Sequence, residues 1–492
     1  MLLFVAALVH LATAVDNGLA RTPPLGWNSW VTCEDEGCTH DFCNEAEVKS
    51  VATAMQDNGM QALGYTYVNL DDCWVALERT AEGKLTWDAG RFPSGLPSLI
   101  SWLHERNFRF GLYTSAGNAT CSSGGRPSAG GAPGSRGHYN EDAATFASWE
   151  VDVSRRRTRR PSAPRRRNTL AAASGRAAHR SHPLRPSAPL QYVKLDWCGD
   201  IKDHLLEGKQ AHIDFGNAMR YAGRPVATSA FSSFYLLTHS SSTYLLLQHT
   251  TSYAGRPMVL EVVAGYFFMG AGIRSVANTW RFCEDHKDTW SKTAEELACR
   301  VDQGANATGA PGGWAFMDFL MTGGAGCSPF TPGGVAPVNA SNAHCPGMSD
   351  DEYRTEFSLW SLTQSPLIVA TDVRNMTAVM AQALLNKEIL DIHQSTATPP
   401  GAKLATWLCA EPLKCQVWGR KVAADGSAWL VALTNLGGKE HGITAEFKHL
   451  GWDAQTTGSV RDLWSHADIG NATGSFSSTV PSHGTRLVRI TR

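Results

Sequence analysis

The stretch VKLDWC (193–198) places Lys194 and Asp196 two residues apart in an apolar run. Residues two apart on a strand lie on the same face, so the ammonium group and the carboxylate would be neighbours. A lysine beside an aspartate holds the carboxylate in its ionised form, which a nucleophile requires. The same pair could also be a buried ion pair that closes a layer of the core. The local sequence does not decide between these two interpretations.

A second acidic cluster is NLDDCW (69–74), which offers the adjacent carboxylates of Asp71 and Asp72. Such a pair can accept hydrogen bonds from the hydroxyl groups of a sugar. If the motif stood alone, a helix N-cap with an acidic neighbour would be the simpler interpretation. The other clusters shift the balance toward binding.

A third cluster is ANTWRFCEDHKDTW (277–290). Here Asp285 is a carboxylate placed for proton transfer, and Arg281 could orient a substrate. An exposed acidic turn is the simpler interpretation for Glu284 and Asp288. Trp27 and Trp30 could stack on the apolar face of a sugar, although core packing is the default for tryptophan.

Apolar runs alternate with helix-like stretches between about residues 24 and 400. This alternation predicts a parallel sheet, and the number of repeats predicts a (β/α)₈ TIM barrel. Several runs carry polar residues near their C-terminal ends, the face of such a barrel that holds the active site. The runs are 65–74, 108–117, 192–200, 258–265 and 365–372.

The pattern changes after Pro399 and Pro400 to short alternating strands that are separated by glycine-rich turns. Such a pattern predicts a C-terminal antiparallel β-sandwich. We therefore expect a catalytic barrel at 15–399 and a sandwich domain at 400–492.

The first residues, 1–14, have the apolar run and small-residue ending of a signal peptide. Twelve cysteines and five N-x-S/T sequons also favour an oxidising secretory route with surface glycans. We expect the protein outside the cell or in a lysosome- or vacuole-like compartment, with no membrane span. The sequons are at Asn118, Asn306, Asn339, Asn375 and Asn471.

Two segments interrupt the barrel pattern. Residues 153–191 contain eleven arginines and no acidic residue, and without them the formal charge would be −12. Residues 226–252 contain no charged residue, and the repeat YAGRP flanks them on both sides. We interpret 153–191 and 226–257 as atypical insertions that precede strands: either translated non-coding sequence such as retained introns, or disordered loops.

An ordered set of motifs resembles glycoside hydrolase family 27, which comprises α-galactosidases and α-N-acetylgalactosaminidases. The resemblance covers nearly the whole chain apart from the two insertions. Its motifs are VDNGLARTPPLGWNSW, NLDDCW, GLYTSAGNATC, YVKLDWC, ANTWRF with the following DTW, and APGGW.

The resemblance implies a retaining double displacement without metal or cofactor. Asp196 matches the family's nucleophile, and Asp285 matches its general acid/base. The matches to the sites that bind the terminal galactose or shape its subsite are Trp30, Asp71, Asp72, Tyr113, Lys194 and Arg281.

Glu261 matches the position where galactosidases carry Glu and N-acetylgalactosaminidases carry a smaller Ser. A carboxylate there leaves little room for an acetamido group, so galactose is favoured. Ala264 is smaller than the usual galactosidase residue, which keeps α-N-acetylgalactosaminidase as the alternative. In GGWAFMDF (312–319) only Asp318 remains of the family's acidic pair.

The family's disulfide bridges imply the pairs Cys33–Cys73, Cys38–Cys43 and Cys121–Cys198, the last of which would brace the strand end that carries Asp196. Proximity in the sequence suggests the further pairs Cys409–Cys415 and Cys327–Cys345, and elimination then leaves Cys283–Cys299.

Two other classes of function are weaker. A galactose-binding pseudoenzyme would use the same pocket without turnover, but both Asp196 and Asp285 are retained. A nucleic-acid-binding protein rests only on the arginines of 154–167, which lack interleaved aromatic residues. The expected partner is a carbohydrate with a terminal α-galactose, and a homodimer is left open.

Overall fold

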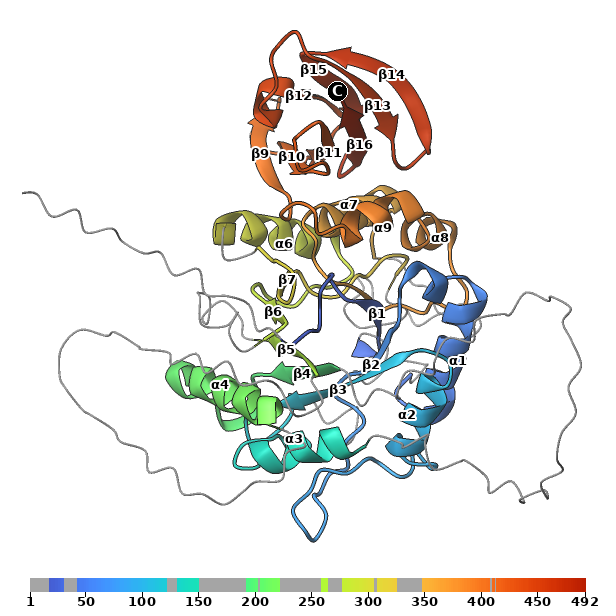
Figure 1. Ribbon diagram of the computed structural model, residues 1–492, viewed down its shortest axis with the longest axis vertical. Coiled ribbons are helices and arrows are strands. Elements are labelled where there is room, and N and C mark those ends of the chain that lie inside the picture. Colours follow the sequence, from blue (N-terminus) through green and yellow to red (C-terminus); the bar gives the residue numbers. More distant parts are fainter. Residues whose placement is uncertain are drawn as a thin grey trace, which may run out of the picture.

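Figure 1 shows a computed structural model in which a barrel-like domain carries a smaller β-domain at one side. The leader 1–14 and the insertions at 153–191 and 226–257 lie outside the described residues. The structure describes residues 17–30, 42–121, 131–149, 192–201, 204–221, 258–263, 277–304, 308–324, 347–407, 409–411 and 413–492.

Eight parallel strands form the expected (β/α)₈ barrel, in the order β7-β6-β5-β4-β3-β2-β1-β8. The seam between β7 and β8 is bridged by Leu320, whose N–H donates to the Ile368 carbonyl and whose own carbonyl accepts from Ala370. The strands are β1 (Leu25–Asn28), β2 (Tyr67–Leu70), β3 (Arg109–Ser115), β4 (Tyr192–Asp196), β5 (Val259–Val263), β6 (Thr279–Arg281), β7 (Trp314–Phe316) and β8 (Leu367–Val369).

Helices surround these strands, and amphipathic spacing explains their packing. In the first helix, Asn44 is the N-cap and Val48, Val51 and Met55 face the core. The helices are α1 (Glu45–Asp57), α2 (Leu96–His104), α3 (Tyr139–Ser148), α4 (Leu205–Tyr221), α6 (Trp290–Gln303), α7 (Asp350–Leu362), α8 (Ala378–Leu384) and α9 (Lys387–Gln394). None of the described helices is both long enough and apolar enough to cross a membrane.

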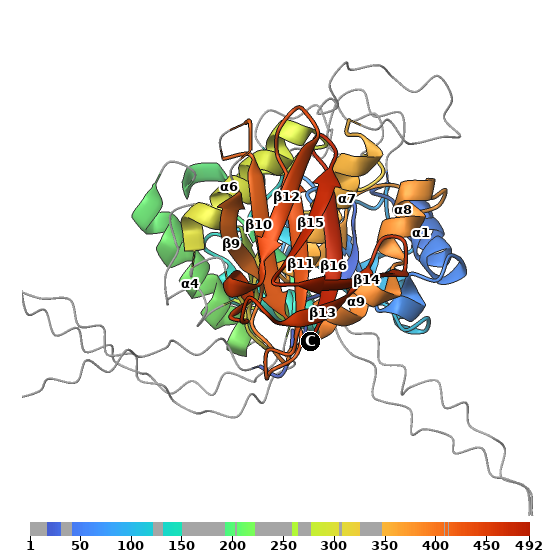
Figure 2. The ribbon, with the colours of Figure 1, turned by 90° about the horizontal axis from the view of Figure 1, so that it is seen from above.

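The C-terminal domain has a six-stranded sheet, in the order β14-β13-β16-β11-β10-β9, that is joined by the pair β12 and β15. Figure 2 looks along this domain onto the barrel. The antiparallel pairing and the apolar cluster between the strands form the expected sandwich. The strands are β9 (Ala402–Trp407), β10 (Cys415–Lys421), β11 (Ala428–Asn435), β12 (His441–Glu446), β13 (Thr457–Asp462), β14 (Ala467–Thr473), β15 (Ser475–Val480) and β16 (Thr485–Thr491).

The two domains meet through α7, which lies between the barrel and the sandwich in Figure 1. Thr355 on α7 donates to the His483 carbonyl at 2.7 Å, and the His483 ring bonds to Glu352 and stacks on Trp290 at 4.3 Å. One apolar cluster runs through both domains, from Leu359 of α7 to sandwich residues such as Leu430. The domains therefore share a core.

The disulfide pattern partly corrects the expectation from the sequence. Cys43 pairs with Cys73, so the expected pairs Cys33–Cys73 and Cys38–Cys43 are wrong. The physical reason is that Cys43 immediately precedes the N-cap of α1, which packs beside the end of β2 and brings the two Cα atoms to 6.1 Å. Cys33, Cys38, Cys327 and Cys345 lie outside the described residues.

Among the described cysteines, three further bridges agree with the expected pairs. They are Cys121–Cys198, Cys283–Cys299 and Cys409–Cys415. The first of them joins the loop after β3 to the end of β4, where Asp196 lies.

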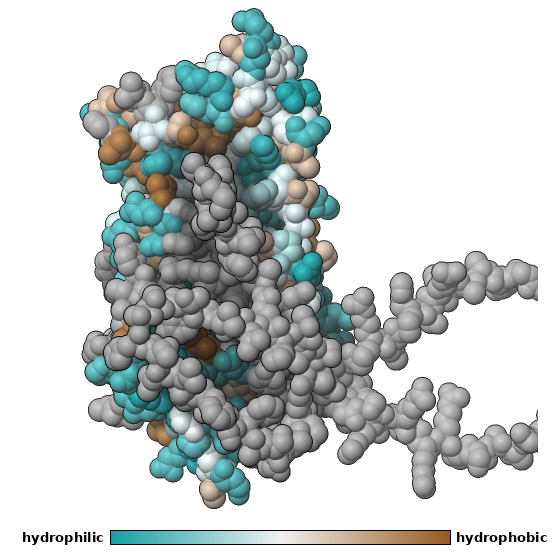
Figure 3. Space-filling view, turned by 60° about the vertical axis from the view of Figure 1, so that its left-hand side comes forward, coloured by the Kyte–Doolittle hydropathy of each residue, from teal (hydrophilic) through white to brown (hydrophobic). Residues whose placement is uncertain are grey.

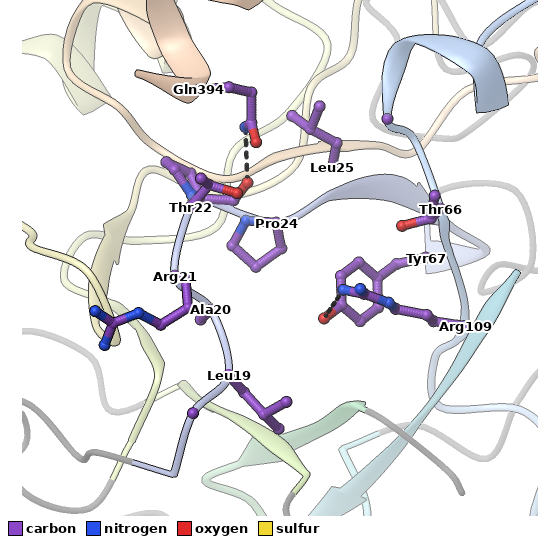
Figure 4. A pocket seen from close by; sticks show the side chains of 13 residues that line it. Leu19, Ala20, Arg21, Thr22, Pro24, Leu25, Thr66, Tyr67, Arg109 and Gln394 are labelled. Carbon is purple, nitrogen blue, oxygen red and sulfur yellow. Dashed lines mark hydrogen bonds between the residues drawn. The ribbon is translucent and has the colours of Figure 1, made fainter. Parts of the chain in front are cut away.

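A pocket of about 200 Å³ lies at the N-terminal ends of β1, β2 and β3. Figure 4 shows Arg109 lying against the ring of Tyr67, with a hydrogen bond of 3.0 Å between its guanidinium and the phenol oxygen. In a barrel this is the face opposite the active site. These two residues lie on the inner side of the barrel floor.

The described surface has few large exposed hydrophobic side chains, and they are scattered. In the face drawn in Figure 3, the described residues are mostly hydrophilic, with small separate hydrophobic spots. The exposed large hydrophobic residues are Leu77, Leu206, Leu413 and Ile469.

Candidate active site

Lys194 on β4 forms the centre of the site. Its ammonium nitrogen lies 2.8 and 3.0 Å from the two carboxylate oxygens of Asp71, which follows the last residue of β2. Both side chains are almost completely buried. Burial by itself would lower the pKa of Lys194, but Asp71, Asp196 and Glu261 together raise it above its ordinary value. The lysine is therefore a fixed positive charge inside the barrel.

Three aromatic rings surround this ammonium group. The ring centres of Trp30, Phe319 and Tyr113 lie 4.6, 5.0 and 5.2 Å from its nitrogen. Such contacts are attractive because the ring faces carry partial negative charge. Trp30 and Tyr113, two of the expected subsite residues, thus lie beside this ammonium group, and so does Phe319, which was not foreseen. Its position directly after Asp318 was the available signal.

Asp196 is the last residue of β4, two residues beyond Lys194 on the same face. Its Oδ1 accepts the N–H of Trp197 at 2.7 Å. The sulfurs of Cys121 and Cys198 and a carboxylate oxygen of Asp196 lie within 4.8 Å of one another, so the bridge lies directly beside this strand end. Burial raises the pKa of Asp196, and Lys194 opposes that rise while Asp285 adds to it.

Arg281, the last residue of β6, connects two further carboxylates. Its Nη2 lies 2.6 Å from Asp285 Oδ1 and 3.0 Å from Asp318 Oδ2. Arg281 lowers the pKa of Asp285, whose side chain is 54% exposed. Burial raises the pKa of Asp318, although Arg281 acts against this rise. The two acids therefore differ in both their exposure and the direction of their pKa shift.

Asp318 adopts a left-handed backbone conformation, with a φ of 69°. This conformation is uncommon for residues other than glycine, and its cost is offset here by several hydrogen bonds. The carboxylate accepts the N–H of His286 at 2.8 Å, and the carbonyl accepts the indole N–H of Trp360 at 2.9 Å. The loop after β7 therefore aims Asp318 at Arg281.

Glu261 on β5 is fully buried and lies in register with Lys194 on β4 and Thr279 on β6. Tyr192 donates its hydroxyl hydrogen to Glu261 Oε2 at 2.5 Å. Burial raises the pKa of Glu261 to about 7, against the lowering effect of Lys194. Tyr192 was not predicted, but its place two residues before Lys194 marks the same inward face.

Asp72 is buried beside Asp71, to whose Oδ1 its N–H donates at 3.0 Å. The predicted site residues thus lie at or inside the C-terminal ends of the barrel strands. Two of the simpler interpretations are now decided by the structure: Trp27 packs in the core, and Glu284 is exposed. The expectation that Asp288 is exposed is wrong. Its side chain is buried and accepts a hydrogen bond from the Tyr353 hydroxyl at 2.7 Å.

Comparisons with known proteins connect this geometry to a family. The family model "Alpha galactosidase A" matches residues 22–158, and "Alpha galactosidase C-terminal beta sandwich domain" matches residues 414–490. An α-galactosidase A from Cellvibrio japonicus is 30% identical over 376 residues, which cover 76% of this chain and 68% of that protein. The chain belongs to glycoside hydrolase family 27.

Family 27 relatives match along almost the full length. An α-galactosidase from Cyamopsis tetragonoloba is 29% identical over 97% of this chain and 88% of its own. The fold is shared with the crystal structure of α-galactosidase I from Mortierella vinacea, at 23% identity and a TM-score of 0.68, over 97% of this chain and 98% of that one. A family 27 β-L-arabinopyranosidase from Geobacillus stearothermophilus also has a TM-score of 0.68, at 21% identity over 96% and 97% of the two chains.

Proposed function

We propose that this family 27 protein is an α-galactosidase that releases terminal α-linked galactose with retention of configuration. The observation that carries the proposal is the placement of two aspartates in different charge environments at one end of the barrel. Asp196 lies beside the buried cation Lys194, whereas Asp285 is half exposed and bound to Arg281. The curated α-galactosidases that match this chain support the choice of substrate.

Asp196 is the proposed nucleophile. Because Oδ1 accepts the Trp197 N–H, the second oxygen, Oδ2, is the one that attacks the anomeric carbon. The bond from that carbon to the aglycone oxygen breaks as the glycosyl–aspartate ester forms. Lys194 favours the ionised carboxylate before attack.

Asp285 is the proposed general acid and base. It gives its proton to the departing aglycone oxygen and then takes a proton from the water that cleaves the ester. Asp285 raises the pKa of Asp196, and the same repulsion between like charges acts on Asp285. Once Asp196 is esterified this repulsion disappears, which favours the charged form of Asp285 and so its action as a base.

The proposed sugar site is the surface around Lys194. The carboxylates of Asp71 and Asp72 and the ammonium group of Lys194 can bind hydroxyl groups, and the rings of Trp30 and Tyr113 wall the subsite. Following the family pattern, Arg281 and Glu261 are placed on the side of the 2-position, where Glu261 disfavours an acetamido group. Asp318 acts by holding Arg281.

The decisive experiment compares release of p-nitrophenol from the α-galactoside and from the α-N-acetylgalactosaminide. We expect much faster turnover of the α-galactoside, and none of it in Asp196→Asn. Faster turnover of the acetamido substrate would instead support an α-N-acetylgalactosaminidase. Binding of galactose without turnover by well-folded protein would support a pseudoenzyme.

A further inference from the structure

The inner face of β4 presents Tyr192, Lys194 and Asp196 at successive levels of the barrel. Tyr192 lies at the lowest of these levels, paired in register with Val259 of β5. Its hydroxyl nevertheless reaches the next level and donates to Glu261 Oε2 at 2.5 Å. Both side chains are buried. This hydrogen bond links the barrel floor to the proposed sugar site.

The hydroxyl of Tyr192 has a defined direction. A tyrosine has only one hydroxyl hydrogen, and Glu261 accepts it. The contact of 3.4 Å between the Tyr192 oxygen and Thr279 Oγ1 must then use the hydrogen of Thr279. Below it, the Tyr192 ring packs edge-on against Tyr67 at 5.4 Å, and Tyr67 is held by Arg109 (Figure 4). The ring and the hydroxyl of Tyr192 are both fixed.

Glu261 is consequently held by one oxygen only. Its Oε1 is buried and has no hydrogen-bond partner among the described residues, and leaving a buried polar atom unpaired is costly. The charged groups that act on this carboxyl are Lys194 from β4, Arg281 from β6 and Asp318 from the loop after β7. A hydroxyl group of a bound sugar would supply the missing partner.

We propose that Tyr192 is a positioning residue that occupies Glu261 Oε2 and so presents Oε1 to the 2-hydroxyl group of the substrate. This inference rests on the proposed function and extends it to a residue outside the sugar site. The acid–base state of Glu261 supports it: burial raises its pKa to about 7. Below that pH the carboxyl is protonated, and because Oε2 accepts from Tyr192, the proton lies on Oε1 as a donor to the sugar.

The test is a double-mutant-type cycle, in which the change of substrate takes the place of the second mutation. Wild type and Tyr192→Phe are each assayed on p-nitrophenyl α-galactoside and on the 2-deoxy-α-galactoside, which lacks the hydroxyl in question. We expect kcat/KM of the variant to fall roughly tenfold on the α-galactoside and to equal that of wild type on the 2-deoxy substrate. A purely structural role would reduce both by the same factor. Equal loss on both substrates, or loss on neither, overturns the proposal.

Two further variants complete the design. Tyr67→Phe removes a hydroxyl from the same barrel floor without touching Glu261, so it should behave as wild type on both substrates. If it reproduces the Tyr192→Phe pattern, the proposal is wrong. Thr279→Val removes the hydroxyl that orients Tyr192 and should give the same pattern in weaker form, which allows the test even where Tyr192→Phe does not fold.

This design separates the inference from the function on which it rests. If wild-type protein hydrolyses the α-galactoside but the loss of kcat/KM in Tyr192→Phe does not depend on the substrate, only the inference is overturned. Folded wild-type protein that turns over neither substrate overturns the proposed function and the inference with it.

Discussion

A single nitrogen of Arg281 contacts two carboxylates, Asp285 at 2.6 Å and Asp318 at 3.0 Å. The guanidinium is buried, and its pKa is raised because the attraction of the acids exceeds the effect of burial. The charge that Asp285 experiences therefore depends on Asp318, although Asp318 is remote from it in sequence.

This relationship predicts the pH dependence of Asp318→Asn. The general acid Asp285 must be protonated, so kcat/KM falls as the pH rises through the pKa of Asp285. Removing the negative charge of Asp318 removes the second carboxylate bound to the same nitrogen of Arg281, so Arg281 acts more strongly on Asp285 and lowers its pKa further. We expect the basic limb of the kcat/KM profile to move to lower pH. Asparagine tolerates the left-handed backbone at this position, so the loop is retained. A shift to higher pH would contradict the arrangement.

The retaining mechanism predicts the anomer of the first product. Because galactose is displaced twice at the anomeric carbon, proton NMR of the early reaction should show α-galactose, which later mutarotates. If β-galactose forms first, Asp196 is not the nucleophile. For the inactive variant Asp196→Asn, the matched control is Asp200→Asn. Asp200 lies near Asp196 in sequence but pairs with Arg136 at the surface. It should keep wild-type activity.

The role of Asp285 predicts a dependence on the leaving group. Asp285→Ala should lose roughly 10²–10⁴-fold in kcat/KM on substrates with an alkoxide leaving group. On the p-nitrophenyl substrate the loss should be smaller, because p-nitrophenolate departs without a proton. Azide should restore turnover by attacking the glycosyl–Asp196 ester, and because this second displacement again inverts the anomeric carbon, the product should be α-galactosyl azide. A loss that is equal for all leaving groups, without azide rescue, would exclude this role.

The buried ion pair predicts a difference in stability between two lysines. Lys194→Met leaves Asp71 charged and without its ammonium partner, which should destabilise the protein by about 3 kcal/mol. Lys387 forms an exposed pair with Asp391, so Lys387→Met should leave the free energy of unfolding almost unchanged. Urea denaturation measures both, and adding Asp71→Asn to Lys194→Met should recover part of the loss. Equal effects of the two lysine variants would refute the difference.

The two insertions predict the behaviour of a shortened chain. Strands β4 and β5 begin at Tyr192 and Val259, directly after 153–191 and 226–257. The described strand starts that follow the two segments lie at the face opposite the site, so we expect a chain without 153–191 and 226–257 to fold and keep its activity on the α-galactoside. Sequencing of the transcript tests the retained-intron interpretation directly. A deletion variant that fails to fold would show that these segments contribute to the native state.

Much of the barrel was predictable because parallel strands that are covered on both faces produce continuous apolar runs. The runs containing Asp71, Tyr113 and Asp196 are strands β2, β3 and β4, with boundaries a few residues shorter than predicted. Strands β1, β6 and β7 are not among the predicted runs, because three or four residues are too few to show a period. Strand β8 is equally short, but it lies within the longer apolar run 365–372.

Site residues were predictable from the sequence where the chemistry requires a particular residue type. They were not predictable where packing determines which residues lie beside the site. The pair of Lys194 with Asp71 joins residues that are far apart in sequence, and only strand order brings them together. Phe319 and Tyr192 look like ordinary core aromatic residues in the sequence. The position of Tyr192 comes from the register of neighbouring strands, and that of Phe319 from the loop after β7. The Cys43–Cys73 bridge was missed for a similar reason, because it depends on where the start of α1 lies relative to the end of β2.

The contact around His483 has a consequence for the evolution of the chain. The sandwich residue His483 is bound to Glu352, Thr355 and Trp290, all of which belong to helices of the barrel domain. Exchange of the sandwich between relatives would therefore require matched changes on α6 and α7. The two domains are separable by sequence pattern, but through these contacts they fold against each other as one unit.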